Sequence, residues 1–220
     1  MVLDSRRNMV DPFLSWLAQH LQFISANLFS WLALLAAFLA GLFFYLSTPN
    51  DIQSGSFLLL ASLFVFINGL LDAIDGKIAK LTHTASKQGD FLDHALDRFA
   101  DVFIVAGLAL SPWCDIRLGF FAIIGMLLTS YMGTQAQAVG YQRVYSGLLG
   151  RADRLVILMI APVIQFLLVQ QQIFFIWQFS FLEWVLILLA VIGNITAVQR
   201  FYYTISWFRK QKKNKEPRKK

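Results

Sequence analysis

Residues 72–97, DAIDGKIAKLTHTASKQGDFLDHALD, carry two pairs of aspartates at helical spacing inside a strongly apolar chain. Asp72 and Asp75 are spaced i,i+3, and Asp93 and Asp97 are spaced i,i+4, so each pair shares one helix face. The apolar flanks predict membrane helices, in which a central carboxylate costs roughly 2.5–3.5 kcal/mol on insertion scales. The stretch therefore predicts two antiparallel membrane helices that bring their acids together around cations.

The composition around this stretch predicts an integral membrane protein. The chain has 220 residues, of which 57% are hydrophobic and 15% charged, whereas ordinary soluble domains are roughly 45–50% apolar. A spanning helix needs about 20 mostly apolar residues. The sequence therefore predicts an all-α fold with six transmembrane helices, at 28–47, 56–81, 91–110, 118–139, 155–169 and 181–207.

The two ends of the chain flank this membrane domain, which we place at 28–207. Residues 12–24 mix apolar and polar side chains within an N-terminal segment, 1–27, and they predict an amphipathic helix along the membrane surface. Residues 208–220 form a basic tail. The single cysteine, Cys114, excludes an intrachain disulfide and a zinc cluster.

Basic residues indicate how the chain is oriented. The net charge is +6, but much of it lies in the tail, so an anionic membrane surface explains it better than nucleic acid does. With six spans both termini lie on one side. The loops on that side hold Lys77, Lys80, Lys87, Arg143, Arg151 and Arg154, and the opposite loops hold Arg117. We therefore expect a multi-pass protein of the cell membrane with its termini and its acids in the cytoplasm.

The acids themselves indicate the kind of ligand. Six of them, at the cytoplasmic ends of spans two and three, are Asp72, Asp75, Asp90, Asp93, Asp97 and Asp101. Convergent carboxylates without cysteine favour hard cations, Mg²⁺ first and Mn²⁺ or Ca²⁺ as alternatives. His94 directly follows Asp93, so we expect it to point to another helix face as an ordinary interfacial residue.

Small residues share the face of the first acidic pair. Gly76 and Ala79 lie at i+4 and i+7 from Asp72. Small residues of this kind serve close helix packing in membranes, or they leave a shallow dent where a base and a diphosphate approach the backbone. The neighbouring acids favour the dent.

The gapped pattern of these residues resembles a known signature. Its members are Asp72-x₂-Asp75-Gly76-x₂-Ala79-Lys80-x₈-Gly89-x₃-Asp93-x₃-Asp97, similar to D-x₂-D-G-x₂-A-R-x₈-G-x₃-D-x₃-D of the CDP-alcohol phosphatidyltransferases. Every spacing agrees, and one residue departs, Lys80 in place of Arg. The resemblance implies a six-helix membrane enzyme, usually a homodimer, that uses two divalent cations to move a lipid phosphate from a CDP-lipid to an alcohol and release CMP.

The resemblance also implies residue roles. Asp97 would act as general base, and the metal ligands would be Asp72, Asp75, Asp93 and Asp97. The CDP site would be lined by Asp72, Gly76, Ala79, Lys80 and Gly89. Because Lys lacks the bidentate fork of Arg, Lys80 predicts weaker geometric control of a phosphate.

A second segment bears on the alcohol acceptor. Gly147-x₃-Arg151-x₂-Arg154 is similar to the G-x₃-R-x₂-R segment of phosphatidylinositol phosphate and archaetidylinositol phosphate synthases, where arginines hold the phosphate of inositol phosphate. The alternative is flanking charge that sets topology. Residues 130–138 depart from those enzymes, because Thr134 and Gln135 stand where basic residues are usual; Arg143 and Arg200 are candidates to compensate.

Several alternatives stay open. The apolar faces suit isoprenoid or acyl chains, so the donor would be CDP-archaeol or CDP-diacylglycerol. Residues 129–155 are similar to those of archaeal family members, which favours archaeol. Glycerol phosphate, serine or unphosphorylated inositol are other acceptors. From a different class, a cation transporter could use the acidic cluster, and a scaffold without catalysis would explain Lys80.

Overall fold

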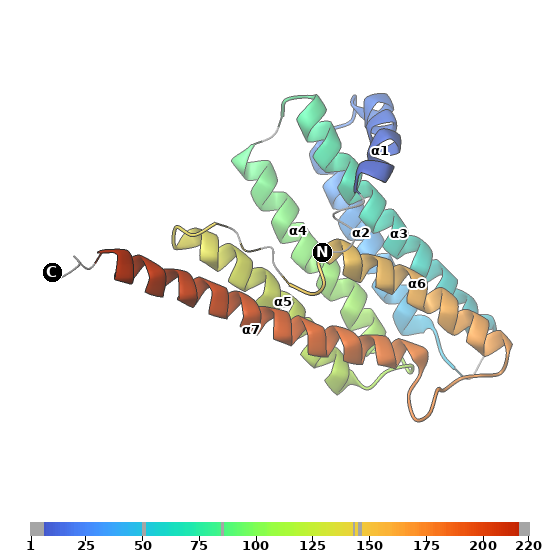
Figure 1. The fold of residues 1–220 in the computed structure, drawn as a ribbon. Coiled ribbons are helices and arrows are strands. Elements are labelled where there is room, and N and C mark those ends of the chain that lie inside the picture. The colour runs from blue at the N-terminus through green and yellow to red at the C-terminus, as the bar shows by residue number, and fades with distance from the viewer. Residues whose placement is uncertain (1–6, 50–51, 85, 143, 145–146, 216–220) are drawn as a thin grey trace.

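The chain folds into helices throughout the part that the structure describes. This computed structural model describes residues 7–49, 52–84, 86–142, 144 and 147–215. Those residues contain seven helices and no named strand (Figure 1). The helices are α1 (Arg7–Leu21), α2 (Ala26–Leu46), α3 (Ile52–Leu81), α4 (Lys87–Ala109), α5 (Ile116–Ala138), α6 (Arg151–Gln170) and α7 (Phe181–Lys215).

Five of these helices, α2, α3, α5, α6 and α7, are long and apolar enough to cross a membrane. The protein is therefore a multi-pass membrane protein by length and composition. The remaining long helix, α4, has 23 residues, enough to cross, but it carries four aspartates and Arg98 along its first four turns. Composition alone thus supports five of the six predicted spans.

Helix boundaries differ from the predicted ones where polar residues extend a helix. The predicted span 155–169 begins earlier, at Arg151, because the Asp153 carboxylate accepts a hydrogen bond from the Gly150 amide at 2.9 Å and caps the first turn. The last helix continues beyond 207 to Lys215, inside the predicted tail. Apolar composition marks the part of a helix that meets lipid, whereas backbone hydrogen bonds carry the helix further.

Small residues set the spacing of two helix pairs. Gly41 of α2 and Gly107 of α4 approach so closely that a Cβ on Gly107 would overlap the Gly41 backbone. Gly125 of α5 meets the backbone of Gly193 and Asn194 in α7 in the same way. Glycine at these crossings lets the backbones touch, as membrane helices commonly require.

The acidic stretch lies at one end of the helix bundle. α3 ends and α4 begins there, α1 lies against α3, and α6 starts nearby (Figure 1). The short connection is held by local hydrogen bonds: the Thr84 amide donates to the Ala79 carbonyl at 3.1 Å, and the Gly89 amide donates to Ser86 Oγ at 3.1 Å. This turn joins α3 to α4, α2 packs against both helices, and the acids of α3 and α4 approach one another through their side chains.

Candidate metal and anion site

Three carboxylates from two helices converge. Asp72 and Asp75 come from the last turns of α3, and Asp93 comes from the second turn of α4. One oxygen from each lies within 4.8 Å of the others. The Ser30 hydroxyl of α2 donates to Asp75 Oδ2 at 2.7 Å, which orients that carboxylate. Several carboxylate oxygens at this separation fit a hard divalent cation.

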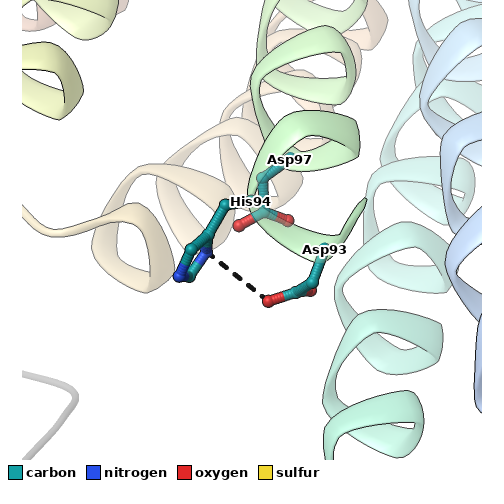
Figure 2. Close-up of side chains that lie close together, drawn as sticks. All are labelled: Asp93, His94 and Asp97. Atoms are coloured by element: carbon teal, nitrogen blue, oxygen red, sulfur yellow. Dashed lines mark ion pairs between the residues drawn. The ribbon is translucent and has the colours of Figure 1, made fainter. Parts of the chain in front are cut away.

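A second group adjoins the first on α4. Ligand atoms of Asp93, His94 and Asp97 also lie within 4.8 Å of one another, and Figure 2 shows the imidazole turned toward Asp93, at 3.6 Å from Nδ1 to Oδ2. His94 Nε2 lies 3.4 Å from Asp90 Oδ1. The expectation that His94 points away from the acids was wrong, because a half-exposed ring near a helix start can swing over its neighbour. Asp93 belongs to both groups, so the two form one continuous ligand set.

A basic residue from α6 closes this cluster. Arg151 Nη1 lies 2.7 Å from Asp72 Oδ2 and 2.8 Å from Asp97 Oδ1. The sequence indicated Arg151 as an anion-binding residue, but it gave no sign that the guanidinium reaches both acidic pairs. Arg151 and Asp72 are 79 positions apart, and only the packing of α6 beside α3 brings them together.

Asp101 lies one turn beyond Asp97 and is 4% exposed. Its carboxylate meets Arg154 Nη2 at 3.0 Å, Arg98 Nη1 at 3.1 Å and Arg151 Nε at 3.5 Å. The sequence places this aspartate among the six acids and indicates no role for it. Its i,i+4 spacing from Asp97 was the available signal.

The residues predicted to line a nucleotide site lie beside the acids. A Cβ added at Gly76 would meet nothing within 4 Å, so the helix surface is open there, as the predicted dent requires. Ala79 is half-buried, and Lys80 is exposed. Gly89 is fixed by its hydrogen bond to Ser86 in the first turn of α4.

The other residues considered for the acceptor site do not join the acidic cluster in the described part of the chain. Arg200 is 6% exposed, and its Nη1 donates to the Thr129 carbonyl at 2.7 Å where α7 packs on α5. Arg143 lies outside the described residues. The Thr134 hydroxyl donates to the Tyr131 carbonyl of its own helix at 3.0 Å, and Gln135 is exposed. The structure thus brings Arg151 and Arg154 to the acids and holds Arg200 at a helix crossing.

Comparison with known proteins identifies a family for this chain. The family model described as CDP-alcohol phosphatidyltransferase matches residues 23–199. The archaetidylinositol phosphate synthase of Pyrococcus horikoshii is 28% identical over 179 residues, which cover 81% of this chain and 82% of that protein. The phosphatidylinositol phosphate synthase of Cutibacterium acnes is 33% identical over 147 residues, 64% of this chain and 68% of that protein.

A solved structure shares the fold. The Mycobacterium tuberculosis phosphatidylinositol phosphate synthase with CDP-DAG bound matches with a TM-score of 0.67 at 22% identity, covering 87% of this chain and 92% of that one. A second structure of that enzyme, in complex with manganese and citrate, matches with the same TM-score and identity. At this identity the likeness concerns the arrangement of helices.

Proposed function

This chain belongs to the CDP-alcohol phosphatidyltransferase family, and from that premise we propose that its acceptor is a phosphorylated polyol of the inositol phosphate class. The family makes it a metal-dependent enzyme of phospholipid biosynthesis, which takes a lipid phosphate unit from a CDP-lipid donor to an alcohol acceptor. The observation that carries the proposal is the convergence of acids from α3 and α4 with arginines from the first turn of α6.

The acids would hold the cations. Asp72, Asp75 and Asp93 supply one group of oxygens, and Asp93 and Asp97 supply the adjoining group. The carboxylate oxygens favour Mg²⁺, with Mn²⁺ as the alternative. Bound there, two divalent cations would offset the charge of the diphosphate and clamp the phosphate under attack.

The open face of α3 would receive the nucleotide half of the donor. Gly76 leaves space beside the acids, so a cytidine diphosphate can approach the helix backbone. Ala79 and Gly89 have no bulky side chain that would block this approach. Lys80 is exposed there and offers a point charge to a phosphate, without the two parallel donors of Arg.

Asp97 would act as the general base. The acceptor hydroxyl loses its proton to the Asp97 carboxylate as its oxygen attacks the phosphorus that bears the lipid. The bond from that phosphorus to the bridging oxygen breaks, and CMP leaves with that oxygen. The Arg151 guanidinium, 2.8 Å from Asp97, would hold the carboxylate in position for this transfer.

The acceptor would be recognised by its own phosphate. Arg151 and Arg154 offer planar guanidinium groups, which bind phosphate by paired hydrogen bonds. The synthases of inositol-phosphate lipids among the relatives support this class. The uncharged Thr134 and Gln135 leave the hydroxyl contacts to other residues. For the donor, we favour CDP-archaeol over CDP-diacylglycerol, because the Pyrococcus horikoshii relative is an archaetidylinositol phosphate synthase.

The membrane arrangement completes the proposal. Residues 28–207 would form the membrane domain, with α4 as the sixth span and the acids at its cytoplasmic end. Segment 1–27 would lie on the inner surface through α1, where Phe13 and Trp16 are about half exposed. The tail 208–220 would contact anionic lipid from the same side. We further propose a homodimer in the cell membrane.

One experiment tests the acceptor and the donor together. Purified protein in detergent receives Mg²⁺, CDP-archaeol or CDP-diacylglycerol, and a mixture of inositol phosphate, glycerol phosphate, inositol and serine. We expect CMP release, and mass spectrometry should find an inositol phosphate lipid. A product from another alcohol would contradict the proposed acceptor.

The same preparation separates the rival functions. A cation transporter would release no CMP with any alcohol, and liposomes containing it would show metal-dependent ion flux. A scaffold without catalysis would stay inactive even after Lys80→Arg restores the guanidinium fork. We expect Lys80→Arg to change an existing CMP release by less than about tenfold, because it alters one phosphate contact.

A further inference from the structure

The feature that the proposed reaction does not yet use is Asp101. It lies four residues beyond Asp97, outside the family signature, and it is 4% exposed. A buried carboxylate is costly unless it is paired, and this one is paired with three guanidinium groups, at 3.0 Å to Arg154, 3.1 Å to Arg98 and 3.5 Å to Arg151. The number of partners exceeds what neutralisation of one carboxylate requires.

One of those partners keeps a spare donor. The Nε group of Arg154 is buried, and no described residue accepts a hydrogen bond from it. Arg154 itself is 8% exposed. Arg151 Nε is buried as well, but it faces Asp101 Oδ1 at 3.5 Å. Buried N–H groups are almost always satisfied in proteins, so the unsatisfied one on Arg154 indicates that an anion or polar ligand binds there.

The charges around Asp101 indicate what that ligand is. Arg98 offsets the negative charge of Asp101 at 3.1 Å, which leaves the two positive charges of Arg151 and Arg154. Asp72 and Asp97 also pair with Arg151, but in the proposed function these two acids serve the cations. The surplus of two positive charges then matches a phosphate monoester, which carries about 1.5 to 2 negative charges at neutral pH.

We propose that Asp101 is a positioning residue for acceptor recognition, which holds Arg151 and Arg154 so that their guanidinium groups bind the phosphate of the acceptor. This inference rests on the proposed function. Asp101 touches neither substrate in this scheme, since it acts through the two arginines. Arg98, which comes from the same helix as Asp101, contributes charge and does not contact the acceptor.

The test compares acceptor and donor kinetics. We expect Asp101→Asn to raise the KM for inositol phosphate about tenfold or more, the loss expected when charge-assisted hydrogen bonds are misplaced. The KM for the CDP-lipid and the Mn²⁺ affinity measured by electron paramagnetic resonance should stay within about twofold, because the motif acids are unchanged. A merely structural role would move all three quantities together, and that result would overturn the inference.

A matched variant separates positioning from charge. Arg98→Gln removes another partner of Asp101 and should leave the acceptor KM within about threefold, because Arg154 and Arg151 still pair with Asp101 and stay in position. An acceptor KM that rises equally in Arg98→Gln and Asp101→Asn would overturn the inference. Should Asp101→Asn fail to fold, Arg154→Lys keeps the charge and removes the fork. An unchanged acceptor KM in Arg154→Lys would then overturn it, and a selective rise would support it.

The failures of the two proposals look different. Wild-type protein that uses only unphosphorylated alcohols contradicts the proposed acceptor and this inference with it. Wild-type protein that uses inositol phosphate, together with an Asp101→Asn variant of unchanged acceptor KM, contradicts this inference alone.

Discussion

The two ends of the helix bundle hold their buried polar groups in different ways. At the end opposite the acids, called here the Trp113 end, the contacts are hydrogen bonds within the fold. Trp113 Nε1 donates to Ser47 Oγ at 3.1 Å, Ser180 Oγ donates to the Trp113 carbonyl at 2.7 Å, and the Phe181 amide donates to Gln165 Oε1 at 2.8 Å. These bonds join loops to helix ends and leave those groups satisfied.

The acidic end, from Asp72 to Asp101, is held by charge instead. Carboxylates there face one another within 4.8 Å, and Arg151 is shared between acids of two helices. The buried Nε group of Arg154 has no hydrogen-bond partner among the described residues. One end therefore stabilises the fold, whereas the other keeps binding capacity for ligands. Burial also raises the pKa of the Cys114 thiol at the Trp113 end, so this cysteine stays neutral.

Loss of the proposed base should have the largest effect on catalysis at the acidic end, without unfolding the protein. We expect Asp97→Asn to lower kcat by about 10²–10⁴-fold, the usual contribution of general base catalysis. Cation and CDP-lipid binding should fall far less than kcat, because asparagine keeps a side-chain oxygen and Asp72, Asp75 and Asp93 are unchanged. Stopped CMP-release assays and the unfolding temperature measure the two effects.

Asp90→Asn is the matched control, because Asp90 lies on the same helix and is exposed. It should keep a near-normal rate. An Asp97→Asn enzyme with the wild-type rate would show that another group takes the proton.

At the acidic end, the sequence could predict which acids share a helix face, because that depends only on spacing along one helix. Spacings of three and four residues place Asp72 with Asp75 and Asp93 with Asp97 on shared helix faces, and the short connection predicts that the two pairs meet. In the structure α2 packs against both helices, and the side chains of the acids meet between them. The reach of Arg151 across 79 positions could not be predicted, because it depends on how α6 packs against α3. The burial of Asp101 likewise depends on tertiary packing.

The same limit applied elsewhere in the chain. Apolar runs predicted five membrane helices that the structure supports, but the start of α6 was set by a cap from Asp153 to Gly150 rather than by apolarity. His94 was misplaced because ideal helix geometry takes no account of a ring that can rotate at an exposed helix start. Local pattern predicted elements and pairs; the contacts between elements came from packing.

Removal of the shared arginine sharpens the contrast between binding and stability. We expect Arg151→Ala to raise the acceptor KM about 10- to 100-fold, because charge-assisted hydrogen bonds contribute about 1.5–3 kcal/mol each. The CDP-lipid KM should change less. Initial rates with each substrate varied in turn provide the measurement.

The control lies at the other end of the bundle. Arg117 is a span-flanking arginine whose side chain is 84% exposed, and Arg117→Ala should leave both KM values unchanged. If Arg151→Ala alters only the amount of protein inserted in the membrane, Arg151 sets topology rather than recognition.

A hydroxyl behind the acids offers a smaller change at the acidic end. The Ser30 hydroxyl donates to Asp75 Oδ2 at 2.7 Å. We expect Ser30→Ala to weaken Mn²⁺ binding about tenfold, the loss usual for a residue that orients a metal ligand. Titration followed by electron paramagnetic resonance measures it.

Ser62→Ala is the matched control. Ser62 is as buried as Ser30, at 8% exposed, but its hydroxyl donates to the Met159 carbonyl at 2.6 Å between α3 and α6. Its loss should lower the unfolding temperature and leave cation affinity unchanged. Equal cation affinities in the two variants would show that the Ser30 hydroxyl does not support the metal site.

The smallest change tests the Trp113 end. Trp113 is 1% exposed, and Trp113→Phe keeps a large ring while removing the indole N–H that meets Ser47. We expect a loss of about 1 kcal/mol in unfolding free energy, the net worth of one hydrogen bond, with kcat and both KM values unchanged. Trp31→Phe, at a ring 53% exposed, should alter neither stability nor rate. A Trp113→Phe enzyme with altered acceptor KM would mean that the two ends are coupled through α4, and that the division between a stabilising end and a binding end is incomplete.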